Sequence, residues 1–198
     1  GGGGSFTLQP VSLTGSTGAG VRVAQAAAPT IKRVALELGG KSAFLVAPGS
    51  DLDAALAAAV RGCFVNNGQT CSATTRLIVP RSQLTEVEAR VAALVEAFVI
   101  GNPLDAATDL GPVASSGQFH TVKDYIDIGM TEGTLITGGR GPVDGQDRGY
   151  FVKPTVFSRL DPKARVVQEE IFGPVLAIIA YSTIEEGIAI ANDSEFGL

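Results

Sequence analysis

The chain has 198 residues, which is room for one domain of ordinary size or for one domain plus a fragment of another. Its formal net charge of −5 argues against a nucleic-acid or anionic-membrane surface, because such a surface needs clustered Lys and Arg. Hydrophobic residues make up 45% of the chain, which excludes global disorder and provides for a sizeable core.

The N-terminal part alternates between short apolar runs and glycine or proline stops. Residues 1–5 read Gly-Gly-Gly-Gly-Ser, a linker-like sequence that we leave out of the fold prediction. After them the pattern predicts a strand at 11–14, a glycine-rich turn at 15–20, a helix at 21–28, and strands at 32–38 and 41–47.

Helix signals become clearer after residue 49. Ser50 with Asp53 three residues later resembles a capping box, and apolar residues then recur at helical spacing up to the stop signal Asn66-Asn67-Gly68. Ser82 is the predicted N-cap of a second helix. The rest of the pattern predicts strands at 76–79, 134–137, 150–157 and 175–181, and helices at 118–128 and 183–192. This alternation of strands and helices predicts an α/β fold with a largely parallel sheet.

Scarce residue types exclude several kinds of site. The chain has one histidine, His120, and two cysteines, Cys63 and Cys71, too few for a tetrahedral zinc site or a disulfide scaffold. A reducing, cytoplasmic setting is therefore expected, and the sequence shows neither a membrane-length apolar run nor a signal peptide. These observations predict a soluble protein without a metal site, whose most reactive side chain is a thiol.

Cys71 lies just past a predicted helix end, in a polar segment that contains glycine. A thiol there can be accessible and close to free backbone N–H groups, which favour a thiolate and can stabilise an oxyanion on a bound carbonyl. An average cysteine is structural, and Cys63, on the apolar face of its helix, is assigned to the core. Both interpretations stay open for Cys71 taken alone.

Glu37 lies between Leu36 and Leu38 and precedes Gly39-Gly40. A carboxylate enclosed in an apolar strand is costly to ionise, which suits a general base. An exposed strand face would accommodate a glutamate equally well, although the two glycines would let a substrate approach closely.

Two further segments have the composition of ligand-binding turns. The Gly15–Gly20 turn can hold a phosphate at a helix N-terminus, but its order, G-x-x-G-x-G, differs from the dinucleotide fingerprint, so an ordinary tight turn is an equal alternative. The segment Glu169–Pro174 offers carboxylates for ribose hydroxyls and an aromatic ring for a flat heterocycle; in isolation, a plain acidic turn is the simpler interpretation. His120 is interpreted as a helix-surface residue.

Taken together, these segments resemble one family. Leu36-Glu37-Leu38-Gly39-Gly40-Lys41-Ser42, Asn67-Gly68-Gln69-Thr70-Cys71 and Glu169-Glu170-Ile171-Phe172-Gly173-Pro174-Val175 occur in an order that closely resembles the aldehyde dehydrogenase superfamily. The Gly15–Gly20 turn resembles the coenzyme-phosphate turn of that family, and the interval of 34 residues from Glu37 to Cys71 fits its pattern. The resemblance runs from about Val11 to the end of the chain.

The resemblance implies a role for each matching residue. Cys71 would be the nucleophile that forms a thiohemiacetal with an aldehyde and, after hydride transfer to NAD or NADP, a thioester. Glu37 would be the base that activates water to hydrolyse that thioester. Glu170 would bind the nicotinamide ribose, and Phe172 would pack near the nicotinamide ring. The residues implied to face the pyrophosphate are Gly15, Ser16, Thr17, Gly18, Ala19 and Gly20.

The resemblance also implies a domain organisation. Residues 6–36 would be a remnant of the coenzyme-binding domain, and residues 37–198 a C-terminally truncated catalytic domain of aldehyde dehydrogenase type, an α/β domain with a largely parallel sheet flanked by helices. The absent parts would include the asparagine of the oxyanion hole, the adenosine-ribose site and a strand used in oligomer contacts. A full-length member would be a homo-oligomer that acts on a small aldehyde, with no nucleic-acid or membrane partner.

The implied function is the oxidation of an aldehyde to a carboxylic acid with NAD or NADP. Two alternatives stay open on the sequence alone. One is coenzyme-independent thiol esterase activity, which needs only Cys71 and an activated water. The other is an inactive fragment that serves as a folding or binding module.

Overall fold

A computed structural model describes residues 10–198 of the chain. The linker-like residues 1–5 and the first four residues of the expected coenzyme-domain remnant lie outside the described residues. The chain divides into two compact units, one that ends at Gly39 and one that spans Gly40–Leu198. Each unit is described by itself.

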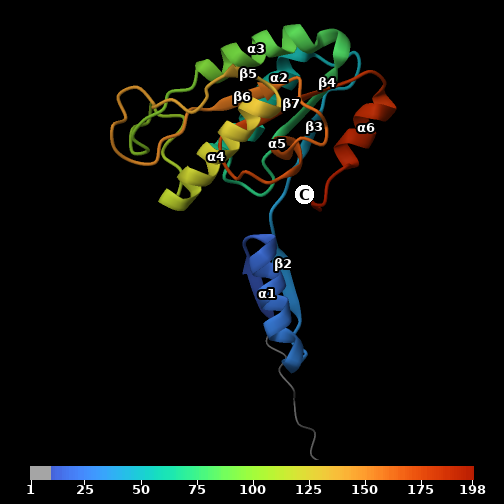
Figure 1. Cartoon of the computed structure of the whole chain (residues 1–198), viewed down its shortest axis with the longest axis vertical. Coiled ribbons are helices and arrows are strands. Elements are labelled where there is room, and N and C mark those ends of the chain that lie inside the picture. The colour runs from blue at the N-terminus through green and yellow to red at the C-terminus, as the bar shows by residue number, and fades with distance from the viewer. Residues whose placement is uncertain (1–9) are drawn as a thin grey trace, which may run out of the picture. The chain divides into compact units, whose positions relative to one another are not determined.

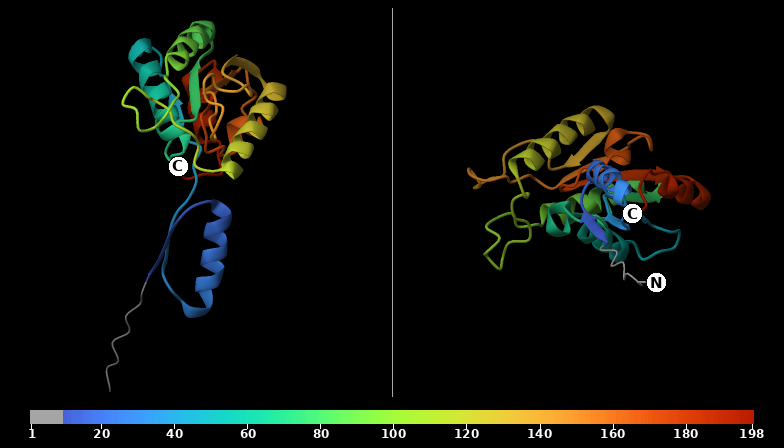
Figure 2. Two further views of the ribbon diagram at one scale, coloured as in Figure 1. Left: turned by 90° about the vertical axis from the view of Figure 1, so that its left-hand side faces the viewer. Right: turned by 90° about the horizontal axis from the view of Figure 1, so that it is seen from below.

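The first unit is a small βαβ arrangement. Strand β1 (Val11–Thr14) pairs in parallel with β2 (Val34–Glu37). Helix α1 (Thr17–Ala27) and a short 3-10 turn, η1 (Ala28–Thr30), connect them, and Figure 2 shows α1 running alongside the two strands. Parallel neighbours need such a crossover, because a tight hairpin can join only antiparallel strands.

Helix α1 begins four residues earlier than the sequence predicted. The side chain of Ser16 accepts a hydrogen bond from Ala19 N (3.3 Å) and so acts as the N-cap. The glycine-rich turn is therefore confined to Gly15 and Ser16, and residues 17–20 form the first helical turn. A cap on the first polar residue after the strand outweighed the low helix propensity of the two glycines.

The second unit is built on a five-stranded sheet in the order β3-β4-β7-β6-β5. Only the β5–β6 pair is antiparallel, so the predicted largely parallel sheet is confirmed. The strands are β3 (Ala43–Leu45), β4 (Arg76–Pro80), β5 (Thr134–Thr137), β6 (Thr155–Ser158) and β7 (Val175–Tyr181).

Helices cover both faces of this sheet (Figure 1). Alternate residues of central strand β7 enter different cores: Leu176 and Ile178 pack with α2 and α3, whereas Ala177 and Ile179 pack with α4, α5 and α6. The helices are α2 (Leu52–Phe64), α3 (Leu84–Glu96), α4 (Ser116–Glu132), α5 (Arg165–Gln168) and α6 (Ile184–Asn192). The result is a three-layer α/β unit. No helix within residues 10–198 is long and apolar enough to cross a membrane.

Three predicted boundaries in the second unit were wrong. Asp51, not Ser50, caps α2 by accepting from Ala54 N (3.2 Å). Ser82 lies inside a 3-10 turn, η3 (Arg81–Gln83), and α3 starts after it without a side-chain cap. The strand predicted at 150–157 begins only at Thr155, because Pro154 has no N–H to donate to a neighbouring strand. Helix α5 was not predicted, since four residues are too few for a periodic pattern.

Candidate active site

The segment that carries Cys71 starts with a turn that only particular residues can form. After α2, Asn66 and Asn67 both adopt left-handed backbone conformations (φ 52° and 57°) within the 3-10 turn η2 (Val65–Gly68). Asparagine tolerates this region better than most residues. The amide of Asn66 donates to Gln69 O (3.0 Å) and that of Asn67 to Pro112 O (3.1 Å), which fixes the turn at both sides.

Glycines at two positions allow backbone segments to meet around this turn. Gly68 has φ +68°, and a Cβ there would lie 2.2 Å from Gly173 O. A Cβ at Gly40 would lie 2.3 Å from Cys71 O. Both contacts are with backbone atoms, which cannot rotate away. The three sequence segments that carry Gly40, Cys71 and Gly173 are therefore in contact within the second unit.

The two cysteines have opposite environments. Cys63 is fully buried in α2, and burial raises the pKa of its thiol to about 12. Its assignment to the core is confirmed. Cys71 is half-buried, and among residues 10–198 the amides of Thr70, Cys71 and Ser72 donate no hydrogen bond. Cys71 is thus an accessible thiol beside free N–H donors.

Glu169 and Glu170 point to different partners. The backbone at Glu169 is extended (φ −93°, ψ 143°), and in such a backbone successive side chains leave on opposite sides. Glu169 accepts from Tyr125 Oη (2.6 Å) and forms a two-point ion pair with Arg165 (2.8 and 2.9 Å), which lowers the pKa of its carboxyl group. Glu170 Oε1 instead accepts from Gly40 N (3.0 Å). The Glu170 carboxylate therefore lies beside the segment that packs against the Cys71 backbone.

Phe172 is held in an unusual conformation. Its backbone is left-handed (φ 54°), and the residue is 36% exposed. The side-chain amide of Gln118 donates to Ile171 O (2.8 Å) and to Phe172 O (3.0 Å), so helix α4 fixes the backbone on either side of the ring. An exposed aromatic residue on a fixed backbone can cover a flat ligand.

Glu37 and the Gly15–Gly20 segment lie together in the first unit. Thr14 pairs with Glu37 across the sheet, and Gly15 N donates to Glu37 O (2.9 Å). The Glu37 side chain is exposed, so the strand does not enclose its carboxylate as the sequence suggested. The reason is that a two-stranded sheet covered by a single helix buries one face at most. Gly20 packs against Leu38, where a Cβ would meet the leucine side chain at 2.8 Å.

The histidine does not contribute to these groups. His120 is exposed on α4, and its Nδ1 lies 2.7 Å from Ser116 O, as expected for a helix-surface residue. Within residues 10–198, no group of three or more His, Cys, Asp or Glu side chains is arranged to hold a metal ion.

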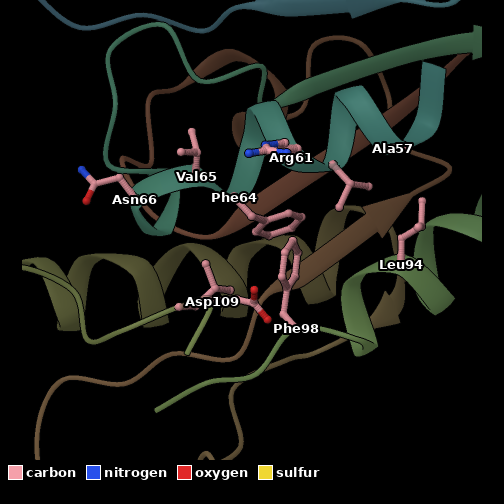
Figure 3. Close-up of a pocket in the computed structure, with 10 residues that line it drawn as sticks. Ala57, Arg61, Phe64, Val65, Asn66, Leu94, Phe98 and Asp109 are labelled. Atoms are coloured by element: carbon pink, nitrogen blue, oxygen red, sulfur yellow. The ribbon is translucent and has the colours of Figure 1, made fainter. Parts of the chain in front are cut away.

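A cavity of about 440 Å³ lies between α2, α3 and the segment that follows α3 (Figure 3). The rings of Phe64 and Phe98 stand 5.8 Å apart in it, and Arg61 and Asp109 contribute charged groups to its lining. Val65 and Asn66, from the turn ahead of Cys71, also line it, but Cys71 itself does not. The cavity therefore borders the candidate site without containing the thiol.

Two features of this region were not predicted. Gly40 was noted only as a small residue, although its amide anchors Glu170. Lys41 was taken as part of a strand, yet it is almost completely buried. The double glycine before Lys41 was the one available signal, because it marks a close backbone approach.

Comparisons with known proteins identify the family of the chain. Residues 5–198 match the family model described as "Aldehyde dehydrogenase family". The chain is 49% identical to a 3-succinoylsemialdehyde-pyridine dehydrogenase of a Pseudomonas species and 46% identical to a geranial dehydrogenase of Castellaniella defragrans, over 95% and 96% of its own length. It spans about 40% of the length of each of these relatives.

Solved structures of aldehyde dehydrogenases also superpose closely on the chain. A mutant of aldehyde dehydrogenase C from Pseudomonas syringae, in complex with NAD+ and octanal, superposes with a TM-score of 0.94 at 49% identity, over 96% of this chain and 39% of that one. A Mycobacterium tuberculosis aldehyde dehydrogenase complexed with NAD+ gives 0.91 at 45% identity, over 94% and 39%. The chain belongs to the aldehyde dehydrogenase family.

Proposed function

We propose that the protein containing this chain oxidises an aldehyde to a carboxylic acid, with NAD+ or NADP+ as hydride acceptor and Cys71 as the covalent nucleophile. The observation that carries the proposal is the environment of Cys71: a half-buried thiol on a fixed turn, beside three amides that donate no hydrogen bond to residues 10–198. Free amides of this kind stabilise the negative charge that develops on a carbonyl oxygen under attack.

Cys71 and Glu37 act in different steps of the reaction: Cys71 forms the thioester and Glu37 promotes its hydrolysis. The Cys71 thiolate adds to the aldehyde carbon, and the carbonyl oxygen takes the negative charge next to the free amides. Loss of hydride from that carbon leaves a thioester on Sγ. Glu37 then accepts a proton from a water molecule that attacks the thioester, the C–S bond breaks, and the acid leaves while the thiolate is regenerated.

The chain's residues fit a dinucleotide. When bound, the oxidised nicotinamide accepts the hydride. The N-terminal turn of α1, capped by Ser16, offers amides to the pyrophosphate, Glu170 offers a carboxylate to the ribose hydroxyls, and the exposed ring of Phe172 offers a surface to the nicotinamide. The NAD+ complexes of the two similar structures support NAD+ as the coenzyme.

The remaining assignments follow from the same family. We assign residues 6–36 to a remnant of the coenzyme-binding domain and residues 37–198 to a catalytic domain; the first compact unit extends three residues past this boundary, to Gly39. An aldehyde substrate is supported by the octanal bound in the Pseudomonas syringae structure. A homo-oligomer in the cytoplasm, with no nucleic-acid or membrane partner, is the expected state of the full-length protein.

The test needs a complete coenzyme site, because the chain spans about 40% of its relatives. We would therefore place the chain in the matching segment of Pseudomonas syringae aldehyde dehydrogenase C; this hybrid is called the restored protein below. NADH formation from octanal is expected with the restored protein and not with its Cys71→Ser variant. Equal turnover by the variant would refute the proposal.

Assays of the 198-residue chain alone, beside the restored protein, distinguish the alternative functions. Coenzyme-independent cleavage of a nitrophenyl ester needs only Cys71 and its amides, so slow esterase activity without aldehyde oxidation is expected. Esterase activity in both proteins, with no NADH formed by either, would instead favour a thiol esterase. No activity in either protein would favour a binding module.

A further inference from the structure

Arg76 is a buried cation whose side chain binds only backbone carbonyls. It is the first residue of β4, shortly after Cys71, and is 2% exposed. Its guanidinium donates to Lys41 O through Nε (2.7 Å), to Ile190 O through Nη1 (2.9 Å) and to Ala191 O through Nη2 (2.8 Å). It forms no ion pair with a carboxylate among residues 10–198. One side chain therefore ties together two segments that are far apart in the sequence.

Two of these three bonds have a local explanation. Ile190 and Ala191 lie in the last turn of α6, where carbonyl groups lack intrahelical partners and carry a partial negative charge, so a cation is a suitable cap. The bond to Lys41 O is different, because Lys41 lies just ahead of β3 and is not part of that helix. A lysine in place of Arg76 would have to bring all three bonds to one nitrogen, whereas the guanidinium spreads them over three. The third bond therefore calls for a reason other than helix capping.

The segment that Arg76 holds leads directly to the proposed coenzyme site. Gly40, the neighbour of Lys41 in the chain, donates its N–H to Glu170 Oε1 (3.0 Å). This is the one hydrogen bond that the Glu170 carboxylate accepts from residues 10–198. Gly40 also packs on the Cys71 backbone, since a Cβ there would lie 2.3 Å from Cys71 O. The conformation of the Lys41 backbone therefore decides where the Gly40 N–H points.

The other bonds of this segment are made by backbone atoms. Lys41 N donates to Leu198 O (3.0 Å), and Arg76 N donates to Ser42 O (3.2 Å). A change of the Arg76 side chain leaves both groups in place, so the segment should stay attached to the sheet. The buried Lys41 carbonyl, however, would lose the guanidinium, and a buried carbonyl without a partner is unfavourable. The segment should then shift to give that carbonyl a new partner, and the Gly40 N–H would shift with it.

We infer that Arg76 is a positioning residue for coenzyme binding: through the Lys41 carbonyl it holds the Gly40 N–H that orients the Glu170 carboxylate toward the ribose hydroxyls. The inference rests on the proposed coenzyme site and adds a residue to it. A carboxylate that is fixed at one oxygen keeps its second oxygen free to accept hydrogen bonds from hydroxyl groups. Orienting it before the coenzyme arrives lowers the cost of ordering it on binding. The affinity for NAD+ should then depend on the Arg76 side chain.

The experiment measures the dissociation constant of NAD+ by calorimetry for the restored protein and its Arg76→Met variant. Methionine fills similar space without a hydrogen-bond donor. Its affinity should be about tenfold weaker, the scale of one lost hydrogen bond to a charged group. Arg76→Lys should recover only a small part of this loss, because it keeps the charge but replaces three nitrogen atoms with one. Circular dichroism checks that each variant is folded.

A double-mutant cycle tests whether Arg76 acts through Glu170. In a Glu170→Ala background there is no carboxylate to orient, so adding Arg76→Met should weaken NAD+ binding by less than about twofold. Lys123→Met is the matched control, because Lys123 is also a buried cation that donates to two backbone carbonyls, those of Arg140 and Gly141. This control should lose stability and keep the NAD+ affinity of its parent.

The outcomes distinguish this inference from the proposed function. If the parent binds NAD+ and Arg76→Met binds equally well, Arg76 only caps α6 and the inference is wrong. An equal loss in the Glu170→Ala background, or in Lys123→Met, would also overturn it, because the effect would then not pass through the carboxylate. If Arg76→Met does not fold, Arg76→Lys decides by the same comparisons. If the parent does not bind NAD+, the proposed coenzyme site itself is refuted.

Discussion

The two units support their functional groups very differently. In the first, one helix covers two strands, the Glu37 side chain is exposed, and α1 buries only Gly20 and Ala27. In the second, apolar cores lie on both faces of five strands, and the turn before Cys71 is fixed by side-chain bonds and by glycine contacts. The comparison teaches that the proposed nucleophile, Cys71, lies on a well-packed scaffold, whereas the proposed base and the proposed phosphate turn lie on a unit with little core of its own.

The largest expected effect is the difference in alkylation rate between the two cysteines of the second unit. Iodoacetamide should label Cys71 at least about 10³-fold faster than Cys63, since a thiol of pKa about 12 is thiolate to only about one part in 10⁴ at pH 8 and is also shielded. Mass spectrometry of partly labelled protein measures the ratio. Similar rates at the two positions would remove the basis for treating Cys71 as the nucleophile.

The next effect concerns Glu37, the proposed base, which lies in the first unit. In the restored protein, Glu37→Gln should lower aldehyde turnover by about 10²–10⁴-fold, the usual contribution of a positioned general base. Steady-state NADH formation measures this loss. Unchanged turnover would mean that Glu37 is only an exposed strand residue and that the base lies elsewhere.

A pair of glycines tests how rigid the Cys71 turn is. Gly68→Ala should lower the free energy of unfolding by about 3–5 kcal/mol, because a left-handed alanine is strained and its Cβ meets the Gly173 carbonyl. Gly49→Ala, also left-handed (φ +79°) but in open space, should cost only about 1–2 kcal/mol. Denaturant titrations compare the two, and equal losses would show that the close contact is unimportant.

The smallest effect is the pH dependence that Lys41 imposes on the second unit. Its folded pKa of about 8 lies below the unfolded value of about 10.4, so the unfolded state binds more protons between these values and Lys41 makes stability rise with pH there. Relative to Lys41→Met, the wild type should gain up to about 3 kcal/mol from pH 7.5 to 10.5. Both proteins contain Cys63, so most of its opposite contribution drops out of the difference between them. A difference that stays constant with pH would contradict the burial of a charged lysine.

Local signals predicted the fold well where apolar runs are bounded by turn residues. Strands β1, β5 and β7 have the predicted bounds, and α2 ends at Phe64, close to the stop signal predicted at Asn66-Asn67-Gly68. Caps were less predictable, because Ser50 and Asp51 are adjacent and equally suited to the role, and the backbone geometry decides between them.

The site was predictable in its parts but not in its connections. Cys71 and Glu170 stand in motifs that can be read along the chain. The bond from Gly40 N to Glu170 joins residues 130 positions apart, so no local pattern contains it. Lys41 follows the spacing of a strand residue, and its burial depends on elements that come later in the chain.

The central claim is that Cys71 carries the substrate as a thioester. In the restored protein with Glu37→Gln, hydrolysis of that intermediate should be slow, while its formation should be largely intact. Incubation with octanal and NAD+, acid quenching and peptide mass spectrometry should then find an octanoyl group on the peptide that contains Cys71, and only when NAD+ is present. An acyl group on another residue, or none on Cys71 while NADH forms, would contradict the claim.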